Sequence, residues 1–522
     1  MPEGKKKYIF LFLFICFFIH GFIIIPQLSI TSDEAAHYNY SVRLIKGLPE
    51  KVITYSDAST MPVSVLNVTP RIVESILFNT KKKFDGGESD IINGRYITLL
   101  ISALIGLFIF MWAKDLYGED AGLAALFFFI FCPNINAHST LVTTDAYAAL
   151  FTIACAYYFW KLNTEFSWKY LILFSISLGI AQVSKQSLTH LIFIFLILSI
   201  TYALLNKSIF KNFSLKFLSF FCVCLIVLLI INTSFLFFKF GHSINDYQFK
   251  SNFFINIQSS FKAVGEIPLP FPEPYIKGLD LTKHLDEIGP GDRKTSGVIT
   301  ILGNRKASEG FWYYYFVSVF FKSPISIILL TGLMLIYAIK RSGSSIINKE
   351  FSLLFIVFYL LMYFSFFYNS QVGIRHVIMI YPLIYVLISK FFIFYKNKTV
   401  LLLLFTYSLA TFYYYLPNLI SYTNEFVLPK RMAYKVVGGS NLDFKQGNKW
   451  ASEYLAKHAE VQKVSETPKT GKILMSVEEF MDLYNTQQYK WIHQFSPVGH
   501  LKHSHLLFHI TEDDLKKVEH TR

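Results

Sequence analysis

Charged side chains are scarce in this chain. Asp, Glu, Lys and Arg make up 16% of its 522 residues, against about 25% in an average soluble protein. Hydrophobic residues make up 53% and aromatic residues 18%. The apolar residues occur in long runs instead of on one face of a helix or strand, which excludes a soluble multidomain protein. We therefore expect an α-helical polytopic membrane protein.

Cysteine is also scarce. The five cysteines all lie in or beside hydrophobic segments and show no Cys-x-x-Cys spacing, which argues against a disulfide framework and a thiolate metal site. We interpret them as small, buried apolar residues. They are Cys16, Cys132, Cys155, Cys222 and Cys224.

Acidic residues are outnumbered, because 35 Asp and Glu face 49 Lys and Arg, which gives a formal net charge of +14. The basic residues mostly flank the apolar runs and form no single stripe. This pattern indicates attraction to a membrane surface, and we expect no nucleic-acid partner. Low Ala and Gly with many Phe, Ile and Lys is typical of an AT-rich bacterium, so we expect the inner (plasma) membrane.

The long apolar runs predict eleven membrane spans, each near the ~20 residues that cross the hydrocarbon. The first covers residues 8–25 after Lys5–Lys7, and no small-residue cleavage site follows it, so we expect a retained anchor. Residues 312–321 fit either an interfacial helix or the start of the span at Pro324. The other ten predicted spans cover residues 93–113, 120–132, 145–160, 170–183, 189–205, 216–238, 324–339, 351–368, 377–395 and 399–416.

The short connections on one side are basic, and those on the other are nearly free of bases, which predicts a cytoplasmic N-terminus. A transmembrane module then covers residues 1–416, with large outer loops at residues 27–92 and 239–310. The second loop is too long for a simple connector and is a candidate substrate-engaging loop. Residues 417–522 combine helical and strand-like patterns and predict a small extracytoplasmic α/β domain. The inner bases include Lys114, Lys161, Lys169, Lys340 and Lys398.

Ionisable side chains gather at the outer ends of the predicted spans. Such residues are costly at membrane depth, so several at one face indicate a site, here for a lipid-borne substrate. Each one alone is equally consistent with an interfacial charge or a charge at a helix terminus. The candidates are Asp33, Glu34, Asp145, Lys185, Arg375 and His376.

The order of these motifs resembles the GT-C class of membrane glycosyltransferases, particularly the bacterial branch related to protein mannosyltransferases and lipid A aminoarabinose transferase. Near the C-terminus, residues 440–447 resemble that branch's Ser-Asn-Leu-Asp-Trp-Gly-Gln motif, but Phe444 and Lys445 stand where Trp and Gly are usual. The resemblance rests on Asp33-Glu34 with Tyr38 and Gly47, Arg95, Asp145, Lys185, residues 310–324, Arg375-His376 with Tyr381-Pro382, residues 421–425 and residues 440–447.

The resemblance implies an inverting transferase with a polyprenyl-phosphate sugar donor, and Asp33 matches the family's catalytic aspartate. Physical chemistry agrees, because a carboxylate can take the proton of an acceptor hydroxyl as the anomeric carbon is attacked. Nearby cations stabilise the leaving phosphate. In the catalytic group we assign Asp33 as general base, with Glu34 and Asp145 positioning the acceptor or the base. To the donor phosphate we assign Lys185, Arg375 and, in a secondary role, His376.

This scheme needs no metal and no other cofactor. His500, His503 and His505, with His509 beyond them, could bind a divalent ion, but the tail lacks the Cys partners of a structural zinc site, so we do not favour metal binding. The sequence leaves the acceptor open among a lipid, a glycan and a protein.

A polytopic transporter or flippase for a lipid-linked or anionic substrate is the alternative function. That class predicts charges near the midplane of broken helices and two repeated halves. The sequence shows neither feature.

Overall fold

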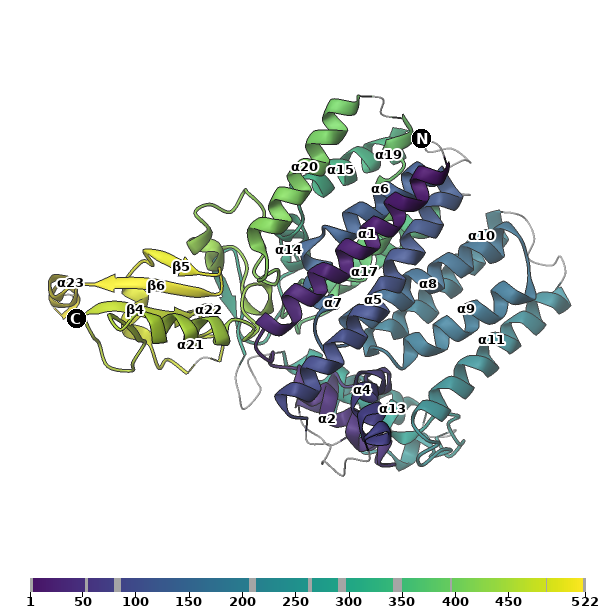
Figure 1. Ribbon diagram of the computed structural model, residues 1–522. Coiled ribbons are helices and arrows are strands. Elements are labelled where there is room, and N and C mark those ends of the chain that lie inside the picture. The colour runs from purple at the N-terminus through teal and green to yellow at the C-terminus, as the bar shows by residue number, and fades with distance from the viewer. Residues whose placement is uncertain are drawn as a thin grey trace.

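The computed structural model describes residues 3–51, 55–78, 86–205, 213–261, 265–289, 297–340, 350–394, 397–484 and 486–519. Long helices run side by side in a bundle, and a small sheet lies beside one end of that bundle (Figure 1). The bundle helices are α1 (Glu3–Ile24), α5 (Glu88–Tyr117), α6 (Glu119–Ile130), α7 (Pro133–Ser139), α8 (Asp145–Thr164), α9 (Trp168–Gln182), α10 (His190–Leu205), α11 (Phe213–Ser234), α15 (Ile325–Lys340), α17 (Phe351–Phe366), α18 (Ile380–Ile388), α19 (Phe391–Phe394) and α20 (Lys398–Tyr415).

Each of the eleven predicted spans overlaps one of these helices. Among the described residues, four helices are long and apolar enough to cross a membrane: Gly4–Gln27, Glu88–Tyr117, Gln186–Leu205 and Ser214–Ser234. A fifth crossing is possible if α6 and α7, bent by 66°, are one span, and four more apolar helices are shorter. The protein is thus a multi-pass membrane protein, and eleven crossings stay a prediction.

Small residues let the bundle helices approach closely. At Gly179 in α9, an added Cβ would lie 2.7 Å from Cδ1 of Ile230 in α11, so a larger side chain would push the two helices apart. Close backbone approach at glycine is a usual device for packing helices in membranes, where the hydrophobic effect between helices is weak.

The five cysteines are all free: Cys132 and Cys155 are buried, whereas Cys16, Cys222 and Cys224 are half-buried.

The two predicted outer loops meet at the end of the bundle opposite the N-terminus (Figure 1). The bend at Pro324 separates α14 from α15, so residues 312–321 contribute to a helix of their own. The elements at this end are α2 (Glu34–Ile45), α3 (Tyr55–Ala58), α4 (Thr69–Leu77), α12 (Asn252–Ser260), α13 (Glu273–Ile288), β1 (Ile299–Ile301), β2 (Asn304–Lys306) and α14 (Tyr314–Lys322).

The C-terminal tail carries a four-stranded sheet in the order β3-β4-β6-β5. The strand β3 runs parallel to β4, and the other two pairings are antiparallel, with Met475 opposite Leu506. Apolar side chains of the two central strands, such as Ile473 in β4 and Phe508 in β6, are buried. The boundary after residue 416 stays a prediction. The elements are α21 (Asn448–Lys457), β3 (Val461–Lys463), β4 (Gly471–Ser476), α22 (Val477–Phe480), β5 (Gly499–Leu501), β6 (His505–Ile510) and α23 (Glu512–Glu519).

Candidate active site

Asp33 and Arg375 form an ion pair across 342 residues of sequence. Asp33 directly precedes α2, where the backbone N–H groups of Ala36 and His37 bond to its carbonyl at 3.1 and 3.2 Å. Arg375 lies in a short 3-10 turn, and its guanidinium packs over the ring of Phe444, 4.7 Å from the centroid. Both side chains of the pair keep some exposure, 27% for Asp33 and 16% for Arg375. The pair is therefore accessible to a substrate.

A second ion pair lies directly behind the first. Nζ of Lys185 is 2.6 Å from Oδ1 of Asp145, and it also donates to the carbonyl oxygen of Arg375 at 3.3 Å. The other carboxylate oxygen of Asp145 accepts from Thr143 at 3.2 Å and lies 3.4 Å from Nδ1 of His138. The structure thus brings four of the six predicted residues into one connected cluster.

Asp33 is held ionised although it is largely removed from water. Burial opposes the charged form, but the Arg375 guanidinium and the nearby His37 together keep the pKa of the Asp33 carboxyl below its ordinary value. Burial also lowers the pKa of His37 to about 4, against the opposing effects of Asp33 and Asp145. At neutral pH the site therefore holds a carboxylate beside a neutral imidazole.

Glu34 points away from Asp33 and is fully buried. Arg95 donates two bonds to it, from Nε to Oε1 at 2.8 Å and from Nη2 to Oε2 at 2.7 Å. Backbone N–H groups of Val142 and Thr31 add bonds of 2.8 Å each, and the Thr31 hydroxyl adds one of 3.0 Å. Both carboxylate oxygens of Glu34 are therefore engaged inside the protein. These contacts fix the segment that carries Asp33, so Glu34 has the geometry of a positioning residue.

His376 packs among aromatic rings, with its ring centroid 5.4 Å from that of Tyr368 and 6.4 Å from that of Phe364. Among the residues described around the Asp33 and Arg375 cavity, neither His376 nor Glu34 forms part of the lining. The secondary phosphate role of His376 stays a prediction.

Asp33 and Arg375 open onto a cavity of about 240 Å³, whose remaining walls come from distant segments. The outer loop supplies residues 297–300, and the C-terminal tail supplies Asp443, Phe444, Glu478 and Tyr484. None of these four tail residues was assigned to the site from the sequence. The motif at residues 440–447 was the available signal, because it contains both Asp443 and Phe444.

The same motif anchors the arginine turn. Oδ1 of Asn441 accepts the backbone N–H of Ile374 at 2.9 Å, and the carbonyl of Asn441 accepts from Nζ of Lys322 at 2.6 Å. The buried Lys322 ends α14 and donates a second bond of 2.6 Å to the carbonyl of Ile420. These two hydrogen bonds of Lys322 were not predicted from the sequence, although residues 310–324 carried part of the resemblance.

Asp443 should make the tail less stable as pH rises. Burial raises its pKa from 3.8 to about 6, despite bonds from the N–H groups of Glu478 (3.1 Å) and Lys445 (3.0 Å). The folded state then holds a proton that the unfolded state has lost, so stability falls between pH 3.8 and about 6. Burial also raises the pKa of Glu478, which adds an effect of the same sign.

Hydrogen exchange of the β4 and β6 amides, corrected for intrinsic rates, should show this fall. Asp443→Asn should reduce this pH dependence of amide protection. The control Asp513→Asn, at an exposed site in α23, should leave the pH dependence unchanged. If the protection of the β4 and β6 amides against exchange increases from pH 4 to pH 6, the prediction is contradicted.

The tail histidines contact one another and aromatic rings. The rings of His500 and His503 lie 4.3 Å apart, His503 lies 4.4 Å from the Tyr415 ring, and Nδ1 of His505 is 3.2 Å from the Ser504 hydroxyl. Within the described ranges, no group of three or more His, Cys, Asp or Glu is placed to hold a metal ion. Independence from metal stays a prediction.

Comparison with known proteins identifies the class of fold. Residues 87–232 match the family described as dolichyl-phosphate-mannose-protein mannosyltransferase. The resemblance to GT-C membrane glycosyltransferases is confirmed by this match and by similarity to the solved structure of ArnT, a GT-C aminoarabinose transferase.

One similar solved structure is ArnT from Cupriavidus metallidurans bound to undecaprenyl phosphate, with a TM-score of 0.51 and 9% identity over 97% of this chain and 98% of that one. The apo form of that protein gives a TM-score of 0.47 and 12% identity, over 74% of this chain and 60% of its own. At such identities the similarity shows the shared fold. No curated protein sequence matches the chain.

Proposed function

We propose that this protein is an inverting glycosyltransferase that moves a sugar from a polyprenyl-phosphate donor to an acceptor hydroxyl or amine. The observation that carries the proposal is the Asp33–Arg375 pair, a carboxylate and a guanidinium that share one cavity, with Lys185 directly behind them. The ArnT relative bound to undecaprenyl phosphate supports this class of donor.

Arg375 has hydrogen-bonding capacity left for a phosphate. Its Nη1 donates to Asp33, whereas its Nε is buried without a hydrogen-bond partner among the described residues. A phosphate would reach Nε only after the guanidinium turns. A guanidinium suits a phosphate because its N–H groups match the geometry of two oxygens. A donor phosphate at this position would share Arg375 with Asp33 and weaken the pair.

That exchange would activate the base. As Arg375 turns to the phosphate, the influence that lowers the pKa of Asp33 decreases, and the carboxylate becomes a better proton acceptor. Asp33 then takes the acceptor proton while the acceptor atom forms a bond to the anomeric carbon. The bond from that carbon to the phosphate oxygen breaks, and polyprenyl phosphate leaves with the electron pair, stabilised by Arg375. A single displacement of this kind inverts the anomeric carbon.

Asp145 has a different part in this scheme from the one expected for it. Its carboxylate contacts Lys185, His138 and Thr143, so it holds the Lys185 ammonium beside the Arg375 turn. The geometry therefore supports Asp145 in positioning a cation, whereas the sequence analysis assigned it to positioning the acceptor or the base.

We place the reaction at the non-cytoplasmic face of a bacterial inner membrane, with the N-terminus inside. The support is the basic character of the predicted inner connections, together with the position of α2, which Asp33 directly precedes, at the end of the bundle opposite the N-terminus (Figure 1).

A reconstitution experiment tests the function. The full chain in nanodiscs would receive undecaprenyl-phosphate hexose or pentose donors with bacterial envelope extract, and mass spectrometry would follow free undecaprenyl phosphate and the mass gain of the acceptor. We expect transfer from lipid-linked donors and none from nucleotide sugars. A parallel assay would place the protein in sealed vesicles and follow the donor lipid across their membranes. Movement of the donor lipid without any product would overturn the proposal in favour of a transporter.

A further inference from the structure

A second cavity, of about 440 Å³, lies in the C-terminal tail and adjoins the Asp33 cavity. Four residues line both: Asp443, Glu478, Leu483 and Tyr484. The volume falls within the roughly 300–1,000 Å³ of small-molecule sites. The two cavities therefore share a wall, and Glu478 and Tyr484 belong to it.

This shared wall is held from outside the tail. The guanidinium of Arg305 donates to the carbonyl of Met481 at 2.8 Å and to that of Asp482 at 3.0 Å. The N–H of Val298 donates to the carbonyl of Leu483 at 2.8 Å. Both donors belong to the outer loop that we predicted to engage substrate. The wall is thus a built feature that joins two distant segments.

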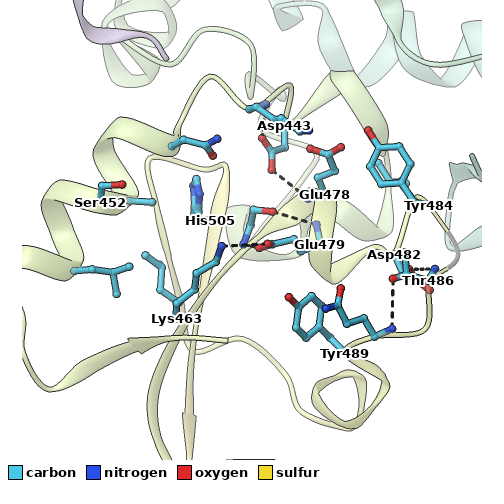
Figure 2. A pocket seen from close by; sticks show the side chains of 18 residues that line it. Asp443, Ser452, Lys463, Glu478, Glu479, Asp482, Tyr484, Thr486, Tyr489 and His505 are labelled. Atoms are coloured by element: carbon cyan, nitrogen blue, oxygen red, sulfur yellow. Dashed lines mark hydrogen bonds and ion pairs between the residues drawn. The ribbon is translucent and has the colours of Figure 1, made fainter. Parts of the chain in front are cut away.

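Several polar groups of the second cavity are already engaged (Figure 2). Glu479 pairs with Lys463 at 3.5 Å, and Asp482 accepts from the N–H and hydroxyl of Thr486 at 2.8 and 3.0 Å. The Glu478 carboxylate hydrogen-bonds with the Tyr484 hydroxyl, and its side chain lines both cavities beside Asp443. A carboxylate offers about four lone-pair sites, so Glu478 can still accept from a ligand. Its carboxylate is the acceptor best placed for a ligand.

The lining defines the chemistry of the occupant. Four carboxylates against two lysines disfavour a phosphate, and the mixture of hydroxyl, amide and carboxyl groups disfavours an acyl chain. Hydroxyl and amide groups suit a polyhydroxylated ring, and the tyrosines offer flat faces with a polar tip. The lining residues used here are Asp443, Glu478, Glu479 and Asp482; Lys445 and Lys463; and Tyr484, Tyr489, Asn448 and Gln488.

We infer that this cavity binds a glycan portion of the acceptor, neutral or amine-bearing, and presents its reactive group to Asp33 past Glu478 and Tyr484. The inference rests on the proposed function, and it names the acceptor class for that site. A glycan on a lipid and a glycan on a protein would share this chemistry.

Direct binding tests the inference without any transfer reaction. Saturation-transfer NMR on the full chain in nanodiscs would use N-acetylglucosamine, glucosamine and glucose 1-phosphate as probes. We expect the first two to bind and the phosphate to bind at least tenfold more weakly. Ala451→Trp, which fills the cavity from α21, should weaken binding at least tenfold. Its matched control is Ala456→Trp, at an exposed position of the same helix outside the lining, and it should bind as the unmodified protein does.

Two further variants guard against misfolding and separate the two proposals. Glu478→Gln should weaken glucosamine more than N-acetylglucosamine, because an amide cannot pair with an ammonium. Asp33→Asn should bind all probes normally. The mass-gain assay on separated lipid and protein fractions then distinguishes the glycan sources. Equal binding by the Ala451→Trp and Ala456→Trp variants, a preference for glucose 1-phosphate, or no sugar binding would overturn the inference. Normal sugar binding without transfer would support a glycan site in this cavity but overturn the proposed function, and with it the acceptor role of the bound glycan.

Discussion

Asp33→Asn is expected to lower sugar transfer by about 10²–10⁴-fold, the usual contribution of a general base. The amide has the shape of the carboxylate but cannot take the acceptor proton. The fold should survive, because Asp33 is partly exposed and its backbone contacts to α2 are unaffected. Initial rates with a saturating lipid-linked donor measure the loss, and an unchanged thermal unfolding midpoint in nanodiscs shows that the protein is intact.

Donor affinity separates this role from a purely electrostatic one. Without the Asp33 charge, Arg375 is free for the phosphate, so Asp33→Asn should bind undecaprenyl phosphate at least as tightly as the unmodified protein does. Arg375→Lys should show the opposite pattern, with weaker donor binding, because an ammonium cannot make paired bonds to two oxygens. A transfer rate close to normal in Asp33→Asn would rule out the base assignment.

Glu34→Gln should instead damage the fold. Removing one partner of a buried ion pair costs about 3–5 kcal/mol, because the other charge is left buried without compensation. Here the guanidinium of Arg95 would lose its carboxylate. The side-chain NH₂ of the new glutamine would also replace one acceptor oxygen and would face N–H donors instead of acceptors. We expect a lower thermal unfolding midpoint and a lower yield of monodisperse protein.

Glu74→Gln is the matched control, because Glu74 is 37% exposed and its partner Arg71 keeps a second carboxylate, Asp90, at 3.8 Å, so we expect a smaller loss of stability. The double variant Glu34→Gln/Arg95→Gln should recover part of the loss, since no buried charge is left. Equal destabilisation by Glu34→Gln and Glu74→Gln would contradict the positioning role.

The contrast between Asp33 and Glu34 shows where sequence reasoning stops. Both carboxylates follow the first span and look equivalent in composition, so both were assigned to the catalytic group. Successive side chains at a helix start point in directions about 100° apart, and here one faces the cavity while the other faces Arg95. Which side chain faces the site depends on packing that hydropathy does not encode.

The membrane helices were predictable because a span is a local property. About twenty apolar residues predict a helix wherever they occur, and Pro133 interrupts the helix after α6 because proline lacks an N–H. The cavity walls are different in kind. Glu478 and Tyr484 come from a segment more than 400 residues after Asp33, and no local pattern marks the contact. A family motif at Asp443 and Phe444 was the one signal that pointed there.

The hydrogen bonds from Arg305 to the carbonyls of Met481 and Asp482 affect how chimeras of this protein should be designed. In a chimera that takes only residues 417–522 from a second protein, the new tail would lack the β1–β2 segment that normally contacts it. Grafting residues 297–306 together with the tail would keep both the donors and the acceptors of these hydrogen bonds. Acceptor choice could then be exchanged as one module while the charge cluster around Asp33 remained in its original scaffold.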